Sequence, residues 1–85
     1  MKELTSMINI GKEMARKLKN IGIDSSDKLI EMGAKEVFLR LKDVYPNVCL
    51  VHLYALEGAI QNTEFNNLSE VKKRELKEFN YFLKK

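Results

Sequence analysis

Hydrophobic residues recur at three- and four-residue steps along most of this chain. Between residues 12 and 21 the apolar positions are Met14, Ala15, Leu18 and Ile21. This spacing places apolar side chains on one face of an α-helix. A sustained alternation of apolar and polar residues, which would indicate a β-strand, is not found. The pattern therefore predicts an all-α fold. Its five predicted helices lie near residues 12–21, 26–32, 34–43, 48–60 and 70–83.

Glycine, serine and proline mark the ends of the predicted helices. Gly22 and Gly33 follow helical segments, and glycine adopts the left-handed conformation of a helix C-terminus without steric cost. Ser25 and Ser69 precede the second and fifth helices, where a side-chain oxygen can cap a free backbone N–H group. The Tyr-Pro-Asn segment that ends at Asn47 should end the third helix, because the residue before a proline avoids the helical region. We expect its asparagine to cap the fourth helix.

The segment 48–60 is apolar on most sides of a helix, which is typical of the buried centre of a small bundle. A glycine inside a helix costs about 1 kcal/mol against alanine, so we expect another part of the backbone to pack closely against Gly58. Phe65, in the polar connector 62–67, is expected to fill the core from a loop. Other inward-facing side chains are expected to be Leu29, Ile30, Met32, Val37, Phe38, Leu41, Val71, Leu76, Phe79 and either Phe82 or Leu83.

The length and composition indicate one small globular domain, residues 1–85. Hydrophobic residues make up 45% and charged residues 32% of the chain, which is typical of a folded domain and unlike a disordered one. The single cysteine excludes an internal disulfide. No apolar run approaches the ~18 residues of a membrane span, and no signal-peptide pattern precedes the first helix. We therefore expect a cytoplasmic protein of bacterial type with no membrane contact.

The formal net charge of +3 permits nucleic-acid binding without requiring it, because dedicated electrostatic binders carry denser basic patches. The Lys-Lys-Arg cluster at residues 72–74 is diluted by Glu70, Glu75 and Glu78, which favours an ordinary charged surface there. Basic side chains also follow one side of the first helix. They are either a phosphate-binding stripe or a solvated face, and the sequence leaves both interpretations open.

The tripeptide Asn-Ile-Gly occurs at residues 9–11 and again at residues 20–22, at the two ends of the first helix. Glycine-bounded hydrophobic turns between short helices are typical of a helix-hairpin-helix element. The hydrophobic residue anchors such a turn in the core, and the following helix presents unpaired N–H groups to an anion. Gly11 would thus open the first helix, and Gly22 would close it. The residues expected to contact nucleic-acid phosphates are Asn9, Ile10, Gly11, Lys12, Arg16 and Lys19.

The opening turn, residues 9–12, resembles the DNA-contacting turn in the C-terminal domain of the RNA polymerase α subunit. In that domain a similar Asn-Leu-Gly-Lys-Lys run begins a helix against phosphate. The commoner helix-hairpin-helix turn has two glycines around the hydrophobic residue, and here Asn9 stands where the first glycine would be. The resemblance implies contact with a phosphate at the start of the first helix.

A broader resemblance covers nearly the whole chain. The order NIGKEMARKLKNIGI, DKLIEMGAKEVFLRLK, a Tyr-Pro break, LVHLYALEGAI and a final charged helix resembles the C-terminal domain of the TfoX/Sxy family, whose members regulate competence genes. The most specific part is LYALEGAI at residues 53–60. The resemblance implies a compact five-helix bundle, SAM-like or helix-hairpin-helix-like, without a cofactor. Family members that regulate competence typically also carry an N-terminal domain.

Residues that suggest enzymatic or metal chemistry are few. Cys49 and His52 are three positions apart in the fourth helix, but zinc usually needs about four ligands, and the chain has no second cysteine or histidine. Glu57 is a lone carboxylate without a partner acid, base or nucleophile. We therefore expect no enzyme activity and no metal, and we place Cys49 and His52 in the core or at its edge.

Two classes of function remain. In the first, the domain binds DNA or another nucleic acid through the turn that ends at Lys12, contacting the backbone and reading little sequence. In the second, the domain binds a regulatory protein or associates with itself through exposed apolar residues, without contacting DNA. The basic residues around the first helix are diluted by Glu3 and Glu13, so the sequence does not decide between the two.

Overall fold

The computed structural model describes residues 3–83, and within that range it contains five α-helices, two single-turn 3₁₀ helices and no strand. The prediction of an all-α fold is confirmed. The elements in chain order are η1 (Leu4–Ser6), α1 (Lys12–Asn20), α2 (Ser26–Met32), α3 (Ala34–Val44), α4 (Leu50–Gln61), η2 (Phe65–Asn67) and α5 (Glu70–Leu83). Residues 1–2 and 84–85 of the predicted single domain lie outside the described range.

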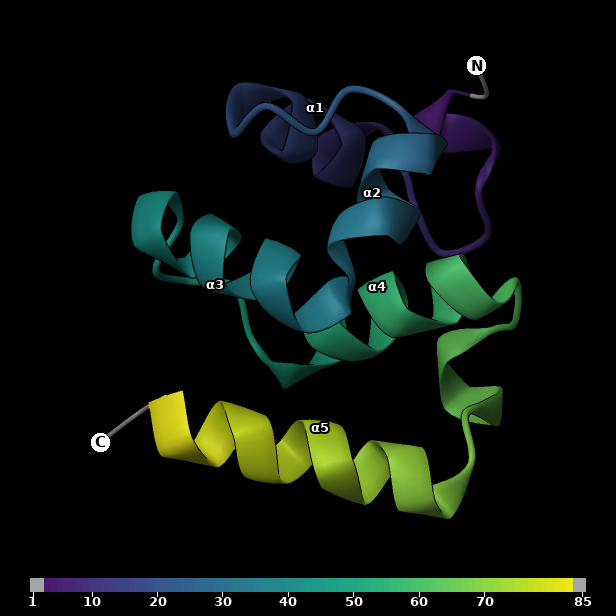
Figure 1. Ribbon diagram of the computed structural model, residues 1–85, viewed down its shortest axis with the longest axis vertical. Helices are drawn as coiled ribbons and strands as arrows, with labels where there is room; N and C mark the ends of the chain where they lie inside the picture. Colours follow the sequence, from purple (N-terminus) through teal and green to yellow (C-terminus); the bar gives the residue numbers. More distant parts are fainter. Residues whose placement is uncertain (1–2, 84–85) are drawn as a thin grey trace.

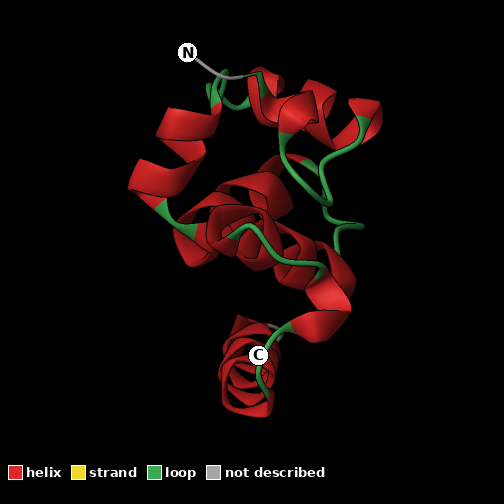
Figure 2. Ribbon diagram, turned by 90° about the vertical axis from the view of Figure 1, so that its right-hand side faces the viewer, coloured by secondary structure: helices red, strands yellow, loops and turns green. Residues whose placement is uncertain are grey.

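The helices are arranged in three levels, as Figure 1 shows. The first level contains η1, α1 and α2, the middle level contains α3 and α4, and α5 runs along the opposite side. α2 packs against α3, and α4 packs against α3, α5 and η2. In Figure 2, α5 is seen end-on, apart from the first two helices. No helix within residues 3–83 is long and apolar enough to span a membrane.

The core is centred on α4, as the sequence predicts. Leu53 and Leu56 of this helix have no exposed surface, and Ala59 is also buried. Val51 is an exception, because it is 53% exposed. The largest side chains that other elements contribute to this core are Leu4, Leu18, Ile23, Leu29, Val37, Phe38, Leu41 and Leu76.

The predicted helix ends are present. The Ser25 Oγ accepts a hydrogen bond from the backbone N–H of Lys28 (3.3 Å), and the Ser69 Oγ accepts one from that of Lys72 (3.1 Å). Gly22 and Gly33 have φ angles of 90° and 88°, which L-residues rarely adopt. After α1 the N–H of Gly22 bonds to the Lys19 carbonyl (3.1 Å). The next N–H, that of Ile23, bonds to the Leu18 carbonyl (2.8 Å), which completes a Schellman motif.

The start of α4 differs from the prediction. Asn47 does not cap this helix, because the helix begins at Leu50 and Cys49 is its N-cap residue. The Nδ1 atom of His52 accepts a hydrogen bond from the backbone N–H of Cys49 (3.0 Å) and lies 3.4 Å from the Cys49 Sγ. Cys49 is exposed and not in the core, and Val48, before the helix, is buried instead. Cys49 and His52 therefore close the start of α4 reciprocally, as in a capping box.

The connector before α5 contacts the core through its backbone and through a leucine. Phe65 was expected to fill the core, but its side chain is 38% exposed. Its Cα lies 3.3 Å from the position that a Cβ on Gly58 would occupy, so the Phe65 backbone packs inward while the ring faces solvent. Leu68, which is 4% exposed, enters the core instead. The expected close backbone approach at Gly58 is confirmed, because such a Cβ would also lie 2.7 Å from the Thr63 carbonyl oxygen.

Some residues predicted to face inward lie on outer helix faces. Ile30 is 50% exposed because the short α2 buries the side that carries Leu29. Val71 and Phe82 are 73% and 66% exposed. Successive helical residues are separated by about 100°, so α5 buries Leu76, packs Phe79 and Leu83 against the core, and turns Phe82 outward.

Candidate nucleic-acid interface

The turn before α1 is fixed to the rest of the domain by Asn9. This residue has φ 71°, the left-handed conformation that asparagine tolerates better than most residues. Its Nδ2 atom donates to the Thr63 carbonyl oxygen (3.0 Å) and, more weakly, to that of Ala55 (3.5 Å). Asn9 therefore has the backbone conformation of a turn glycine, while its side chain points toward α4 and away from any phosphate at the turn.

Ile10 and Gly58 complete this anchorage. Ile10 is 4% exposed and belongs to the core, so it holds the turn and does not contact a ligand with its side chain. A Cβ on Gly58 would lie 2.5 Å from the Asn9 Nδ2 atom. The glycine in α4 therefore leaves space for the asparagine in the turn, although 49 positions separate them in the chain (58 − 9).

The N-terminus of α1 is open. Gly11 is the N-cap residue and supplies no side-chain acceptor for the first-turn N–H groups. Its φ of −88° is accessible to any residue, and no heavy atom lies within 4 Å of the position that a Cβ would occupy. The N–H groups of the first turn have no partner inside an α-helix, and the helix dipole makes this end attractive to an anion. An anion at this helix end would therefore meet an uncrowded Gly11 and N–H groups that no residue of the helix uses.

The three cations predicted for this interface are all exposed, but they differ in their partners. Within residues 3–83, neither Lys12 nor Lys19 forms an ion pair. Arg16 is held by Glu13 through two hydrogen bonds, Nε to Oε1 at 3.1 Å and Nη2 to Oε2 at 2.7 Å. These bonds, with the charge of Arg16, lower the pKa of the Glu13 carboxyl below its ordinary value. A phosphate must compete with Glu13 for Arg16, and the lysines are free of such competition.

A groove of about 260 Å³ lies between this turn and α4. Gly11, Lys17, Val51 and His52 are among the residues that line it. The ammonium group of Lys17 lies 5.3 Å from the centre of the Tyr45 ring, a cation–π contact. Burial lowers the pKa of His52 below its ordinary value, and the charge of Lys17 lowers it further. A neutral imidazole therefore accompanies the lysine in this groove near pH 7.

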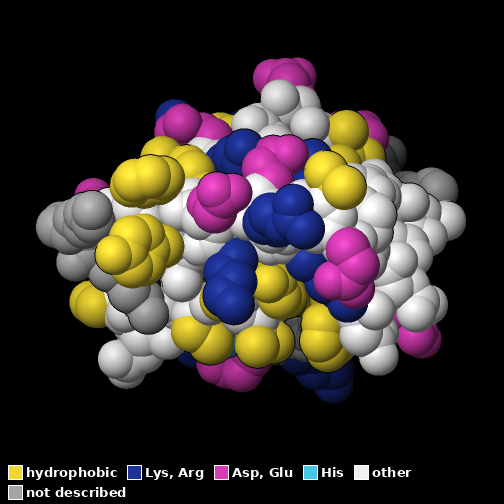
Figure 3. Space-filling model, turned by 90° about the horizontal axis from the view of Figure 1, so that it is seen from below, with side chains coloured by type: hydrophobic (Ala, Val, Ile, Leu, Met, Phe, Trp, Pro, Cys, Tyr) yellow, Lys and Arg dark blue, Asp and Glu magenta, His cyan; other side chains and the backbone are white. Residues whose placement is uncertain are grey.

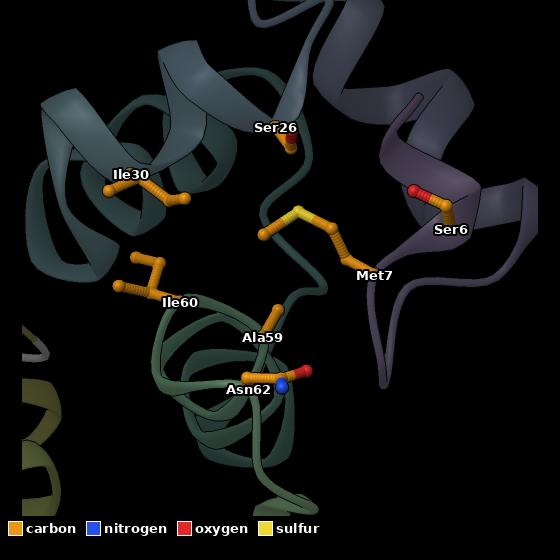
Figure 4. A pocket seen from close by; sticks show the side chains of 7 residues that line it. All are labelled: Ser6, Met7, Ser26, Ile30, Ala59, Ile60 and Asn62. Atoms are coloured by element: carbon orange, nitrogen blue, oxygen red, sulfur yellow. The ribbon is translucent and has the colours of Figure 1, made fainter. Parts of the chain in front are cut away.

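The sequence analysis missed a second groove, between η1, α2 and the end of α4. Figure 4 shows side chains from all three segments around one space of about 490 Å³. Met7, Ile30 and Ile60 supply apolar surface, and Ser26 and Asn62 supply polar groups. The sequence signal that bears on this groove is the pattern of apolar positions. That pattern assigned Ile30 to the core, so it did not predict the groove.

The described residues contain no arrangement suited to hold a metal ion, since no group of three or more His, Cys, Asp or Glu side chains converges within residues 3–83. Cys49 and His52 bond to each other at the start of α4. The carboxylate of Glu57 accepts a hydrogen bond from the side chain of Gln61, one helical turn later. Within residues 3–83, the best candidate for a binding site is therefore the exposed start of α1.

Comparison with known proteins places the chain in a family. A model of the TfoX C-terminal domain matches residues 1–80. An uncharacterized protein from Listeria monocytogenes, in a triclinic crystal form, is 42% identical with a TM-score of 0.94, over 95% of this chain and 92% of that one. A protein of unknown function from the same organism, in a tetragonal form, is 42% identical with a TM-score of 0.93, over 95% and 99%. No curated protein matches. Because the family model matches nearly all of its residues, this chain belongs to the TfoX C-terminal domain family.

Proposed function

We propose that this domain is a non-enzymatic module that binds nucleic-acid phosphates at the start of α1. We further propose that it acts in the bacterial cytoplasm in the regulation of competence and DNA transformation genes, as the TfoX resemblance implies. The observation that carries the proposal is the open N-terminus of α1, where no atom crowds the Cβ position of Gly11 and where Lys12 has no acidic partner within residues 3–83. Lys19, in the last turn of the same helix, also has no acidic partner in that range.

The rigidity of the turn supports this proposal. A binding site held in place before the ligand arrives loses less conformational entropy on binding. Here the buried Ile10 and the amide of Asn9 fix the turn from the inside, so the exposed N–H groups keep their direction. Phosphate contacts of this kind position a protein on nucleic acid and carry no sequence information. The proposed contact therefore contributes to the affinity for nucleic acid but does not recognise the base sequence.

The test is a binding titration with a short labelled DNA duplex at about 50 mM and about 200 mM salt. The double variant Lys12→Glu/Lys19→Glu should weaken binding at low salt by well over tenfold, because each lost contact becomes a repulsion. It should also reduce the salt dependence by about two phosphates. The matched control is Lys28→Glu/Arg40→Glu, which makes the same change in net charge on α2 and α3. Equal losses in both variants would contradict binding at α1.

A second candidate function is self-association or the binding of a regulatory protein. The observation that favours it is the set of exposed apolar side chains on α5, where Val71, Tyr81 and Phe82 are 73%, 60% and 66% exposed. Figure 3 views the molecule from the α5 side and shows hydrophobic side chains gathered toward the C-terminal end of this helix. Sedimentation equilibrium of the wild type and of Val71→Ala/Phe82→Ala tests it. A wild type that associates and a variant that is monomeric would support this function.

A further inference from the structure

Two adjoining hollows follow the line where α5 packs against α4. The first, of about 330 Å³, is lined by Cys49, Leu50, Val51, Lys77, Asn80 and Tyr81. The second, of about 290 Å³, is lined by Tyr54, Glu70, Lys73, Arg74 and Lys77. Lys77 borders both, so they form one continuous groove, which we call the α4–α5 groove. Val51 also lines the groove beside the α1 turn, so the two surfaces meet at Val51.

The charges along the α4–α5 groove are mainly positive. Within residues 3–83, Arg74 and Lys77 form no ion pair. Lys73 donates to the Asn66 carbonyl (3.0 Å) and lies 4.0 Å from the carboxylate of Glu70, which is the only acidic residue lining the groove. The groove therefore has cations that are available to a polyanion.

The opposite flank of α5 is different. There the Glu75 carboxylate lies 2.6 Å from the Lys35 Nζ and 3.4 Å from that of Lys72, and these hydrogen bonds and charges lower its pKa. The cations of that flank are thus neutralised within the domain. The Lys-Lys-Arg cluster is accordingly divided, with Lys72 paired on one flank and Arg74 unpaired on the other.

The hollow at the C-terminal end of the groove has the character of a site for a planar ring. Leu50 and Val51 form an apolar wall, and Tyr81 presents an aromatic ring that is 60% exposed. Asn80, which also lines this hollow, is only 6% exposed, and its Oδ1 has no hydrogen-bond partner within the described residues. A buried amide oxygen without a partner is uncommon, because leaving it unpaired costs free energy. A ligand that supplies an N–H donor after a small rotation of this amide would satisfy it.

We infer that the α4–α5 groove binds a single-stranded nucleic acid, with an unstacked base in the hollow of Tyr81 and Asn80 and the adjoining phosphates on Arg74 and Lys77. Single strands are bound by this combination of a positive groove with aromatic side chains on which bases stack. An acidic peptide would satisfy the cations, and its backbone N–H groups could reach the amide, but its carboxylates offer no planar ring to stack on Tyr81. This inference rests on the proposed function in taking nucleic acid as the ligand. It differs in the surface, which is the α4–α5 groove, and in the ligand's form, which is a single strand and not a duplex.

The experiment measures the affinity of the full chain for a labelled oligothymidine of about 12 nucleotides and for an abasic strand of the same length. Wild type should bind oligothymidine roughly tenfold or more tightly than the abasic strand, because only the first has bases to stack. Tyr81→Ala should remove most of that difference. The matched control, Phe65→Ala, deletes an exposed ring on η2 that does not line the groove, and it should keep the difference.

The cations are tested with Arg74→Glu/Lys77→Glu, which should weaken binding to both strands by more than tenfold at low salt. A second readout is the rate at which iodoacetamide alkylates Cys49, the chain's only cysteine. Saturating oligothymidine should slow this alkylation several-fold, because the thiol lies at the edge of the groove. Circular dichroism of each variant checks that the helices are retained.

The outcomes separate this inference from the proposed function. The inference stands if oligothymidine binds, if its binding depends on Tyr81, and if it slows the alkylation of Cys49. The effect of the α1 variants on duplex binding does not alter this result. If oligothymidine binding depends only on Lys12 and Lys19 and leaves Cys49 unprotected, the α4–α5 groove is not the site and the proposed function survives. Equal affinity for thymidine and abasic strands, or binding of an Asp/Glu-rich peptide as tight as that of oligothymidine, would also overturn the inference.

Discussion

The two Asn-Ile-Gly tripeptides have one sequence and two structures. In the first copy Asn9 is left-handed, with φ 71°, and Gly11 is extended, with φ −88°. In the second copy Asn20 is the last residue of α1, and Gly22 is left-handed, with φ 90°. The left-handed residue is thus the first of the tripeptide in one copy and the last in the other. The position relative to the helix, and not the tripeptide itself, sets the backbone conformation.

The side chains and the free backbone groups of the two copies differ as well. The Asn9 amide donates to the backbone carbonyl of Thr63, after α4, and more weakly to that of Ala55, within α4. The Asn20 amide instead donates to the exposed hydroxyl of Tyr45 at 2.7 Å. The first copy precedes α1 and leaves N–H groups open, while the second follows it and closes carbonyl groups in a Schellman motif. Only the first copy therefore suits an anion, although both carry the same letters.

The largest effect is expected for Gly58→Leu, which removes the space that the first copy occupies. A side chain at residue 58 would meet the Asn9 amide and the Thr63 carbonyl, and overpacking of this kind costs about 1–3 kcal/mol or more. Thermal unfolding should show a loss of a few kcal/mol. Gly11→Leu is the control, because Gly11 has open space, and it should lose far less. A Gly58→Leu variant as stable as wild type would contradict the packing described above.

Asn9→Ala and Asn20→Ala compare the two copies directly. Asn9→Ala should destabilise the domain by about 2 kcal/mol, because it leaves the Thr63 carbonyl without its donor and places alanine at a left-handed position. Asn20→Ala removes one exposed hydrogen bond and should cost about 0.5 kcal/mol. Urea unfolding of both variants measures the difference. If the two losses were equal, the assignment of separate roles would be wrong.

The glycines should show the reverse order. Gly22→Ala forces a Cβ into φ 90° and should cost about 1 kcal/mol or more. Gly11→Ala, at an extended and uncrowded position, should cost about 0.5 kcal/mol, because alanine is a poorer N-cap residue than glycine. Chemical unfolding curves measured side by side are sufficient for this comparison. A larger loss for Gly11→Ala would mean that the first glycine, too, has a conformational role.

The smallest effect is a pH dependence from His52, in the groove beside the first copy. Its folded pKa is lowered by burial and by Lys17, so the unfolded chain binds the proton more readily. This contribution to stability is present above the unfolded pKa, near 6.5. It decreases as the pH falls through that value toward the folded pKa. Unfolding measured between about pH 7.5 and about pH 5 should show decreasing stability, and His52→Gln should flatten this slope. An unchanged slope in His52→Gln would assign the pH dependence to other groups.

Local sequence signals predicted most of the fold. Ser25 and Ser69, Gly22 and Gly33 act over one helical turn, so their effects on helix ends can be predicted from neighbouring letters. The exposed side of a helix is harder to predict, because it depends on which partners cover it. Phe82 shows this, since it was as plausible a core residue as its neighbour until the packing of α5 was known.

The candidate site was predicted less completely. The sequence indicated an anion-binding turn and its cations, but it did not indicate that Arg16 is held by Glu13 or that the Asn9 amide points inward. The Asn9 contacts join residues 46 and 54 positions apart, and no local pattern encodes such a distance. The α4–α5 groove depends on the packing of two helices, and residues 72–74 alone suggested only a neutralised charge cluster.

The central claim is that the first Asn-Ile-Gly copy binds phosphate and the second does not. The most direct measurement is a two-dimensional ¹H–¹⁵N NMR titration of the wild-type domain with a short DNA duplex at about 50 mM salt. The account predicts the largest amide shifts at Gly11, Lys12 and Glu13, which decrease when the salt is raised, and little change at Gly22 and Ile23. Shifts centred on residues 22–23, or no shift at residues 11–13 at saturating duplex, would contradict it.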